Sequence, residues 1–128
     1  MAHGKFGTTI NCMDGRTQFP IANWMKEQFH LDYVDTITEP GPDKILASGQ
    51  GQLVESIRSR AQISAKAHGS KIIVIVAHYD CAGNPVSKEQ HLLHAKKSIQ
   101  TIRSWNLPVE KIIGVWVNED WKVEVIDS

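Results

Sequence analysis

The chain contains two cysteines, and each stands near the end of a run of residues typical of a β-strand. Cys12 comes directly after residues 5–11, whereas Cys81 lies three positions beyond His78, at the end of the apolar run 72–77. Two thiolates and an imidazole that leave one coordination position for solvent are typical of a catalytic zinc site, because structural zinc usually takes four protein ligands. Cys12, His78 and Cys81 therefore predict a Zn²⁺ site with one position for water.

Asp14 and Arg16 follow Cys12 closely and indicate what such a site would do. Zinc lowers the pKa of a bound water to about 7, which makes hydroxide available as a nucleophile at neutral pH. Asp14 is placed to accept a hydrogen bond from that hydroxide, and Arg16 can keep Asp14 ionised through a bidentate pair. The alternative interpretations are two buried structural cysteines beside a satisfied histidine, and a plain surface pair of Asp14 with Arg16.

Two further histidines, His91 and His94, lie three positions apart on an expected helix that follows the Cys81 segment. The simplest interpretation is that both are solvated or half-buried helix residues. The alternative is a role behind the metal ligands or in proton transfer, because histidine titrates near neutral pH. We also expect Asn84 to cap the N-terminus of this helix.

The segments that would position these residues alternate between strands and helices. Strands are expected over residues 5–11, 33–38, 72–77, 111–117 and 121–126. Helices are expected over residues 17–30, 50–68 and 86–105. Residues 39–43 contain two prolines around a glycine and are expected to form a loop. Strands that alternate with helices need crossover connections, which give a mostly parallel sheet, here with an antiparallel last strand.

The expected fold is a single α/β domain over residues 1–128, with helices flanking a central sheet in the order 2-1-3-4-5. In such open sheets, ligands bind beyond the carboxyl ends of the strands, where the strand order reverses. This order places the reversal between the strand before Cys12 and the strand before His78. The two cysteine segments should therefore meet in one crevice.

The two motifs together resemble those of the β-class carbonic anhydrases. The pattern C-x-D-x-R follows the first strand, H-x-x-C follows an apolar strand, and the ending GVWVNEDWKVEVI is similar to the last two strands of that family. The resemblance implies zinc ligation by Cys12, His78 and Cys81, with Asp14 and Arg16 as a dyad. It also implies a resting form in which Asp14 itself binds zinc, and an activity in which zinc-bound hydroxide attacks CO2 to give bicarbonate reversibly.

This chain also departs from the family pattern. It is shorter than a typical member, and residues 38–42 (TEPGP) stand where the family often has Arg-Asn-Ala-Gly-Asn. These differences fall on the expected substrate pocket and subunit contacts, so hydrolysis of carbonyl sulfide or carbon disulfide is an alternative activity. A non-catalytic zinc or redox-sensing module is another alternative, and a phosphate- or nucleotide-binding domain is a third. The resemblance further implies a homodimer or higher homo-oligomer.

Composition narrows the expected partners and compartment. The 128 residues carry 14 basic and 14 acidic side chains, so no net charge favours nucleic acid or an anionic membrane as a partner. No apolar stretch reaches the roughly 20 residues that span a bilayer. The start, Met-Ala-His-Gly-Lys, lacks the apolar segment of a signal peptide, so we expect a cytoplasmic protein with reduced cysteines. The expected partner is a small-molecule substrate, namely CO2, bicarbonate or an analogue.

Overall fold

A computed structural model describes residues 3–127 and places a five-stranded sheet in the order β2-β1-β3-β4-β5 at the centre. The strands are β1 (Phe6–Cys12), β2 (Tyr33–Glu39), β3 (Ile72–His78), β4 (Lys111–Val117) and β5 (Val123–Asp127). Strands β1 to β4 run parallel, and β5 is antiparallel to β4. The predicted strand order and the antiparallel last strand are therefore confirmed.

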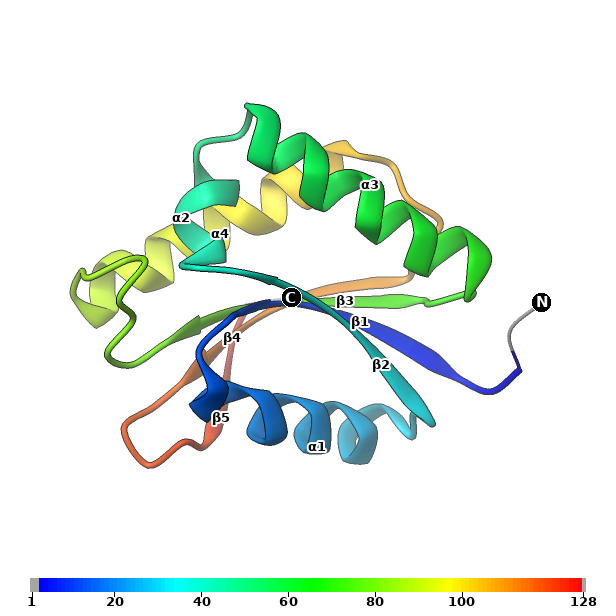
Figure 1. The fold of residues 1–128 in the computed structure, drawn as a ribbon, viewed down its shortest axis with the longest axis horizontal. Coiled ribbons are helices and arrows are strands. Elements are labelled where there is room, and N and C mark those ends of the chain that lie inside the picture. Colours follow the sequence, from blue (N-terminus) through cyan, green and yellow to red (C-terminus); the bar gives the residue numbers. More distant parts are fainter. Residues whose placement is uncertain (1–2, 128) are drawn as a thin grey trace.

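Helices cover both faces of the sheet, as Figure 1 shows. One face carries α1 (Gln18–Phe29), which a short 3-10 turn over Gly15–Thr17 precedes. The other face carries α2 (Pro42–Ala47), α3 (Gln52–Ala67) and α4 (Lys88–Ser104). In the part of the chain that the structure describes, no helix is long and apolar enough to cross a membrane.

Strand β3 separates two hydrophobic cores. Ile73 and Ile75 pack with the buried side chains of α3 and α4, whereas Ile72, Val74 and Val76 pack with those of α1. Successive side chains of a strand point to opposite faces, so both sets come from one alternating sequence. All seven residues of β3 are buried, as expected for a parallel strand that is covered on both faces.

The expected loop over residues 39–43 is wrong in its second half. Pro42 and Asp43 form the first turn of α2, and Gly41 precedes them in the left-handed region with φ of 62°. Proline is accepted at the first position of a helix because its missing N–H has no helical partner there. Two prolines around a glycine predict a loop, but the second proline begins a helix.

The start of α4 also differs from the prediction. The helix begins at Lys88 rather than at residue 86, and the Ser87 hydroxyl caps it by accepting a hydrogen bond from the Gln90 N–H. The prediction that Asn84 caps this helix is therefore wrong. Its side chain instead bonds to Asp43 of α2 and to His94 of α4.

Candidate metal centre

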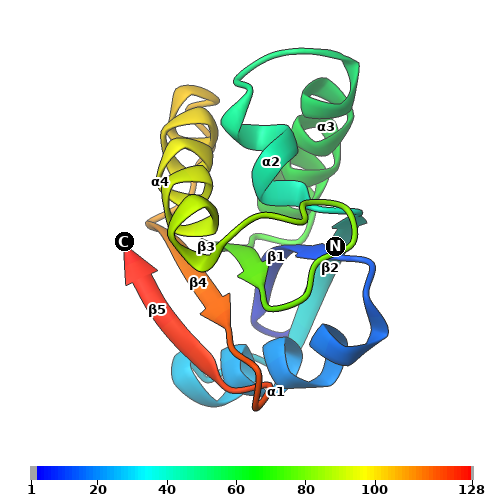
Figure 2. The same cartoon turned by 90° about the vertical axis from the view of Figure 1, so that its left-hand side faces the viewer.

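The carboxyl ends of β1 and β3 bring three potential ligands together. Cys12 ends β1, His78 ends β3, and Cys81 lies in the turn that follows. Their ligand atoms all lie within 4.8 Å of one another, and the two Sγ atoms are 4.0 Å apart although the cysteines are 69 residues apart in sequence. All three residues are buried. Figure 2 shows this end of the molecule, with the long segment after β3 running past the start of α2.

The donor set fits a divalent ion such as zinc. His78 Nδ1 donates to the Tyr79 carbonyl at 2.7 Å, which leaves Nε2 as the nitrogen with a free lone pair. This Nε2 is buried and has no hydrogen-bond partner among residues 3–127. A buried imidazole nitrogen that lacks a partner and lies beside two thiols is the arrangement expected of zinc ligands. Among residues 3–127, these three form the only group of three or more His, Cys, Asp or Glu side chains whose ligand atoms lie this close together.

The surroundings of Cys12 favour the thiolate that a metal ligand requires. A hydrogen bond with Cys81 is the largest of the effects that together lower the pKa of Cys12 to about 4; burial opposes them, and His78 and the backbone of Gly41 and Asp14 add to them. The same bond, together with burial, raises the pKa of Cys81, whereas the Asn84 N–H acts in the opposite direction. A bound cation would favour the thiolate form of both cysteines.

Asp14 and Arg16 form a close ion pair beside this cluster. Arg16 Nη2 donates to Asp14 Oδ2 at 2.7 Å, and Arg16 Nε donates to Asp14 Oδ1 at 3.1 Å. These side-chain bonds lower the pKa of Asp14 to about 2, so it is a carboxylate at neutral pH. Asp14 is not part of the group of mutually close ligand atoms. In this structure the arginine holds the carboxylate, and the two cysteines and the histidine form the candidate ligand set.

Two residues without an assigned role in the sequence analysis hold Arg16 in turn. Its guanidinium lies 4.6 Å from the centre of the Trp121 ring, within the range of a cation–π contact. It also donates to the Asp80 carboxylate at 3.3 Å and to the Asp80 carbonyl at 3.2 Å. Trp121 comes from the β4–β5 connection and Asp80 from the turn after β3. No sequence spacing links these residues, so only the fold identifies them.

His91 and His94 belong to a network around Asp43. His91 is buried, and its Nδ1 donates to Asp43 Oδ2 at 2.6 Å. His94 is half-buried, and its Nδ1 accepts from Asn84 Nδ2 at 3.0 Å. The simplest sequence interpretation is therefore wrong for His91 and agrees with the burial of His94. The sequence pattern does not identify Asp43, because it lies 48 residues from His91 in a segment that the prolines predict to be a loop.

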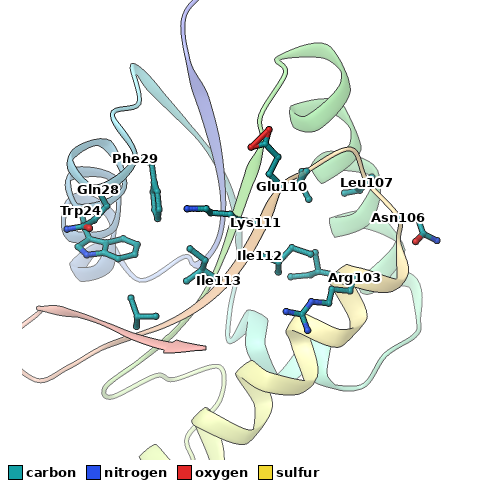
Figure 3. A pocket seen from close by; sticks show the side chains of 13 residues that line it. Trp24, Gln28, Phe29, Arg103, Asn106, Leu107, Glu110, Lys111, Ile112 and Ile113 are labelled. Carbon is teal, nitrogen blue, oxygen red and sulfur yellow. The ribbon is translucent and has the colours of Figure 1, made fainter. Parts of the chain in front are cut away.

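A cavity of about 710 Å³ lies at the other end of the sheet (Figure 3). The amino end of β4 and the C-terminal ends of α1 and α4 line it, and Lys111 Nζ lies 5.7 Å from the centre of the Phe29 ring there. None of the three candidate metal ligands lines this cavity. The candidate metal centre is therefore separate from this cavity.

Together, the fold and the donor set define an α/β protein with a Cys2His candidate metal centre beyond the carboxyl ends of its parallel strands. A family model described as "Putative carbonic anhydrase" matches residues 2–127, so the chain belongs to this carbonic anhydrase family. No curated protein matches the sequence.

Solved structures of carbonic anhydrases share the fold. The β-carbonic anhydrase isoform I of Trichomonas vaginalis is similar with a TM-score of 0.64 and 17% identity, over 94% of this chain and 82% of that one. The carbonic anhydrase of Streptococcus mutans is similar with a TM-score of 0.61 and 15% identity, over 99% of this chain and 87% of that one. The apo form of a carbon disulfide hydrolase is similar with a TM-score of 0.52 and 12% identity, over 94% of this chain and 78% of that one. At these identities the likeness shows a common fold.

Proposed function

We propose that the chain is a zinc-dependent carbonic anhydrase that catalyses CO2 + H2O ⇌ HCO3⁻ + H⁺. The observation that carries this proposal is the convergence of Cys12, His78 and Cys81 beside a carboxylate that an arginine holds. Membership of a carbonic anhydrase family supports it. When bound by these three residues, Zn²⁺ would supply a water acidic enough to act as a nucleophile near neutral pH.

In this proposal the side chains of the dyad have separate tasks. Asp14 accepts a hydrogen bond from the attacking oxygen and so directs a lone pair of that oxygen toward the carbon of CO2. Arg16 keeps Asp14 ionised and fixes its orientation through two hydrogen bonds. The resting form implied by the resemblance, in which Asp14 joins the ligand set, would require Arg16 to release it.

The direct test is CO2 hydration measured by stopped-flow absorbance of a pH indicator, with zinc-loaded protein from neutral to alkaline pH. We expect a rate that increases with protein concentration and is lost in Cys81→Ser. Zinc bound in full without hydration at any pH in this range would overturn the proposal and favour a non-catalytic zinc module.

Hydrolysis of carbon disulfide or carbonyl sulfide is the second candidate, and the likeness to the carbon disulfide hydrolase structure favours it. Both molecules are linear and nonpolar like CO2, so the same oriented nucleophile would attack their carbon. Sulfide release from either compound at a higher kcat/KM than CO2 hydration would assign this activity instead.

A further inference from the structure

We infer that a buried network of Asp43, Asn84 and His91 positions the metal centre and sets its affinity for zinc. The inference rests on the proposed function, because it concerns the support of the same site. Each of the three residues exposes at most 1% of its surface, and each comes from a different segment of the chain.

Asp43 is held by two hydrogen bonds to one oxygen. Its Oδ2 accepts from His91 Nδ1 at 2.6 Å and from Asn84 Nδ2 at 3.1 Å. A buried carboxylate without such donors is costly, so these bonds fix where Asp43 and Asn84 lie. The Asn84 amide also donates to His94 Nδ1 at 3.0 Å, which attaches Asn84 directly to α4.

The Asp43–Asn84 bond joins the segment after β2 to the segment after β3, and each of these segments lies next to a cysteine ligand. Gly41 lies two residues before Asp43 and two residues after Glu39, which is the register partner of Cys12 where β2 and β1 end. The backbone N–H of Asn84 donates to the Cys81 carbonyl at 3.3 Å. Residues that fix the position of metal ligands typically change metal affinity ten- to a hundredfold.

The same two segments also pack backbone against backbone. A Cβ atom added to Gly83 would lie 2.4 Å from the Pro40 carbonyl carbon, and one added to Gly41 would lie 2.7 Å from the Gly83 carbonyl carbon. Ser98 of α4 anchors this assembly by donating to the Asp43 carbonyl at 3.0 Å. Helix α4 therefore fixes the two segments after β2 and β3 relative to each other.

The chain offers a matched control pair far from the metal ligands. His68 Nδ1 lies 2.6 Å from Asp35 Oδ2, the same separation as in the His91–Asp43 pair. Each histidine ring also contacts an aromatic ring, with centroids 4.4 Å apart for His68 on Phe6 and 5.3 Å for His91 on Trp116. Removing the His68 donor tests the loss of an Asp–His bond without touching the metal centre.

The experiment compares His91→Phe, which keeps a ring but loses the donor, with His91→Asn, which restores a donor, and with His68→Phe. Asn84→Leu is a second test variant that leaves the Asp43–His91 bond in place.

The measurements are the zinc Kd by competition with a chelator, the absorption spectrum of the Co²⁺ form, and the thermal midpoint of each metal-free protein. We expect His91→Phe and Asn84→Leu to raise the zinc Kd by about ten- to a hundredfold and to shift the Co²⁺ spectrum. We expect His91→Asn to recover most of the affinity and His68→Phe to keep it.

Two results would overturn the inference alone: wild-type zinc affinity in folded His91→Phe and Asn84→Leu, or an equal loss of affinity in His68→Phe. If His91→Phe does not fold, the zinc Kd of Asn84→Leu alone tests the inference. A wild-type protein that binds no zinc would instead overturn the proposed function, before any variant is compared.

Discussion

Arg16 contacts two carboxylates, and their surroundings distinguish their roles. The Asp14 side chain is 21% exposed, whereas the Asp80 side chain is 68% exposed. Asp14 also lies two residues after Cys12 in the chain. At the scale of single residues, we therefore expect Asp14 to be the carboxylate that acts at the metal centre, whereas Asp80 helps to hold the arginine.

Asp14→Asn should keep zinc and lower kcat for CO2 hydration by about 100-fold or more, because the amide cannot accept and orient as the carboxylate does. Stopped-flow kinetics on protein of measured zinc content checks this. Asp80→Asn is the matched control and should retain most of the activity. Equal activity in Asp14→Asn and wild type would remove Asp14 from the proposed mechanism.

The sequence alone predicts the candidate metal ligands, because their residue types and their positions after apolar strands are visible in it. Cys12, His78 and Cys81 follow apolar strands, and the topology rule for parallel sheets brings such positions together. Asp43 and Trp121 could not be found in this way. Each depends on a partner brought close by tertiary packing, and neither partner stands at a characteristic spacing from it.

At the scale of elements, the segments after β2 and β3 must approach each other closely to place the cysteines. Gly83 is the tightest point of this contact, because its missing side chain leaves room for the Pro40 carbonyl carbon. The sequence predicted the strands before these segments, since alternating β-branched residues mark β2 and a continuous apolar run marks β3. It did not predict α2, whose six residues are too few to show a helical period.

Gly83→Ala should push these two segments apart and weaken zinc binding, because backbone atoms cannot move aside as a flexible side chain can. Chelator competition should show a higher zinc Kd, and thermal unfolding should show a lower midpoint. Gly15→Ala is the control, since a Cβ atom there would meet nothing within 4 Å. The same zinc Kd and midpoint in both variants would refute this view of the contact.

At the scale of the whole molecule, the two cores lie on opposite sides of β3, and the candidate ligands lie around the carboxyl ends of that strand and β1. A metal bound there would connect β1 to the segment after β3, across parts of the chain distant in sequence. The alternation of strands and helices predicted this architecture because crossover connections allow few topologies. The homo-oligomer implied by the resemblance is a separate expectation, which light scattering would test.

Zinc should therefore stabilise the entire fold. A ligand that binds the folded chain and not the unfolded one stabilises it by about 4 kcal/mol at a thousandfold excess over its Kd, equivalent to roughly 15 °C in midpoint. Thermal unfolding with zinc and with a chelator measures this difference. An unchanged midpoint at saturating zinc would contradict binding to the folded protein.

The central claim is that Cys12, His78 and Cys81 hold one zinc ion. Elemental analysis of protein purified without chelator tests it most directly, with folded Cys81→Ser prepared in parallel. We predict one zinc per chain in the wild type and almost none in the variant, because two remaining ligands bind the ion weakly. A wild-type protein without metal that takes up no added zinc, or a Cys81→Ser variant that retains its full zinc content, would contradict the account.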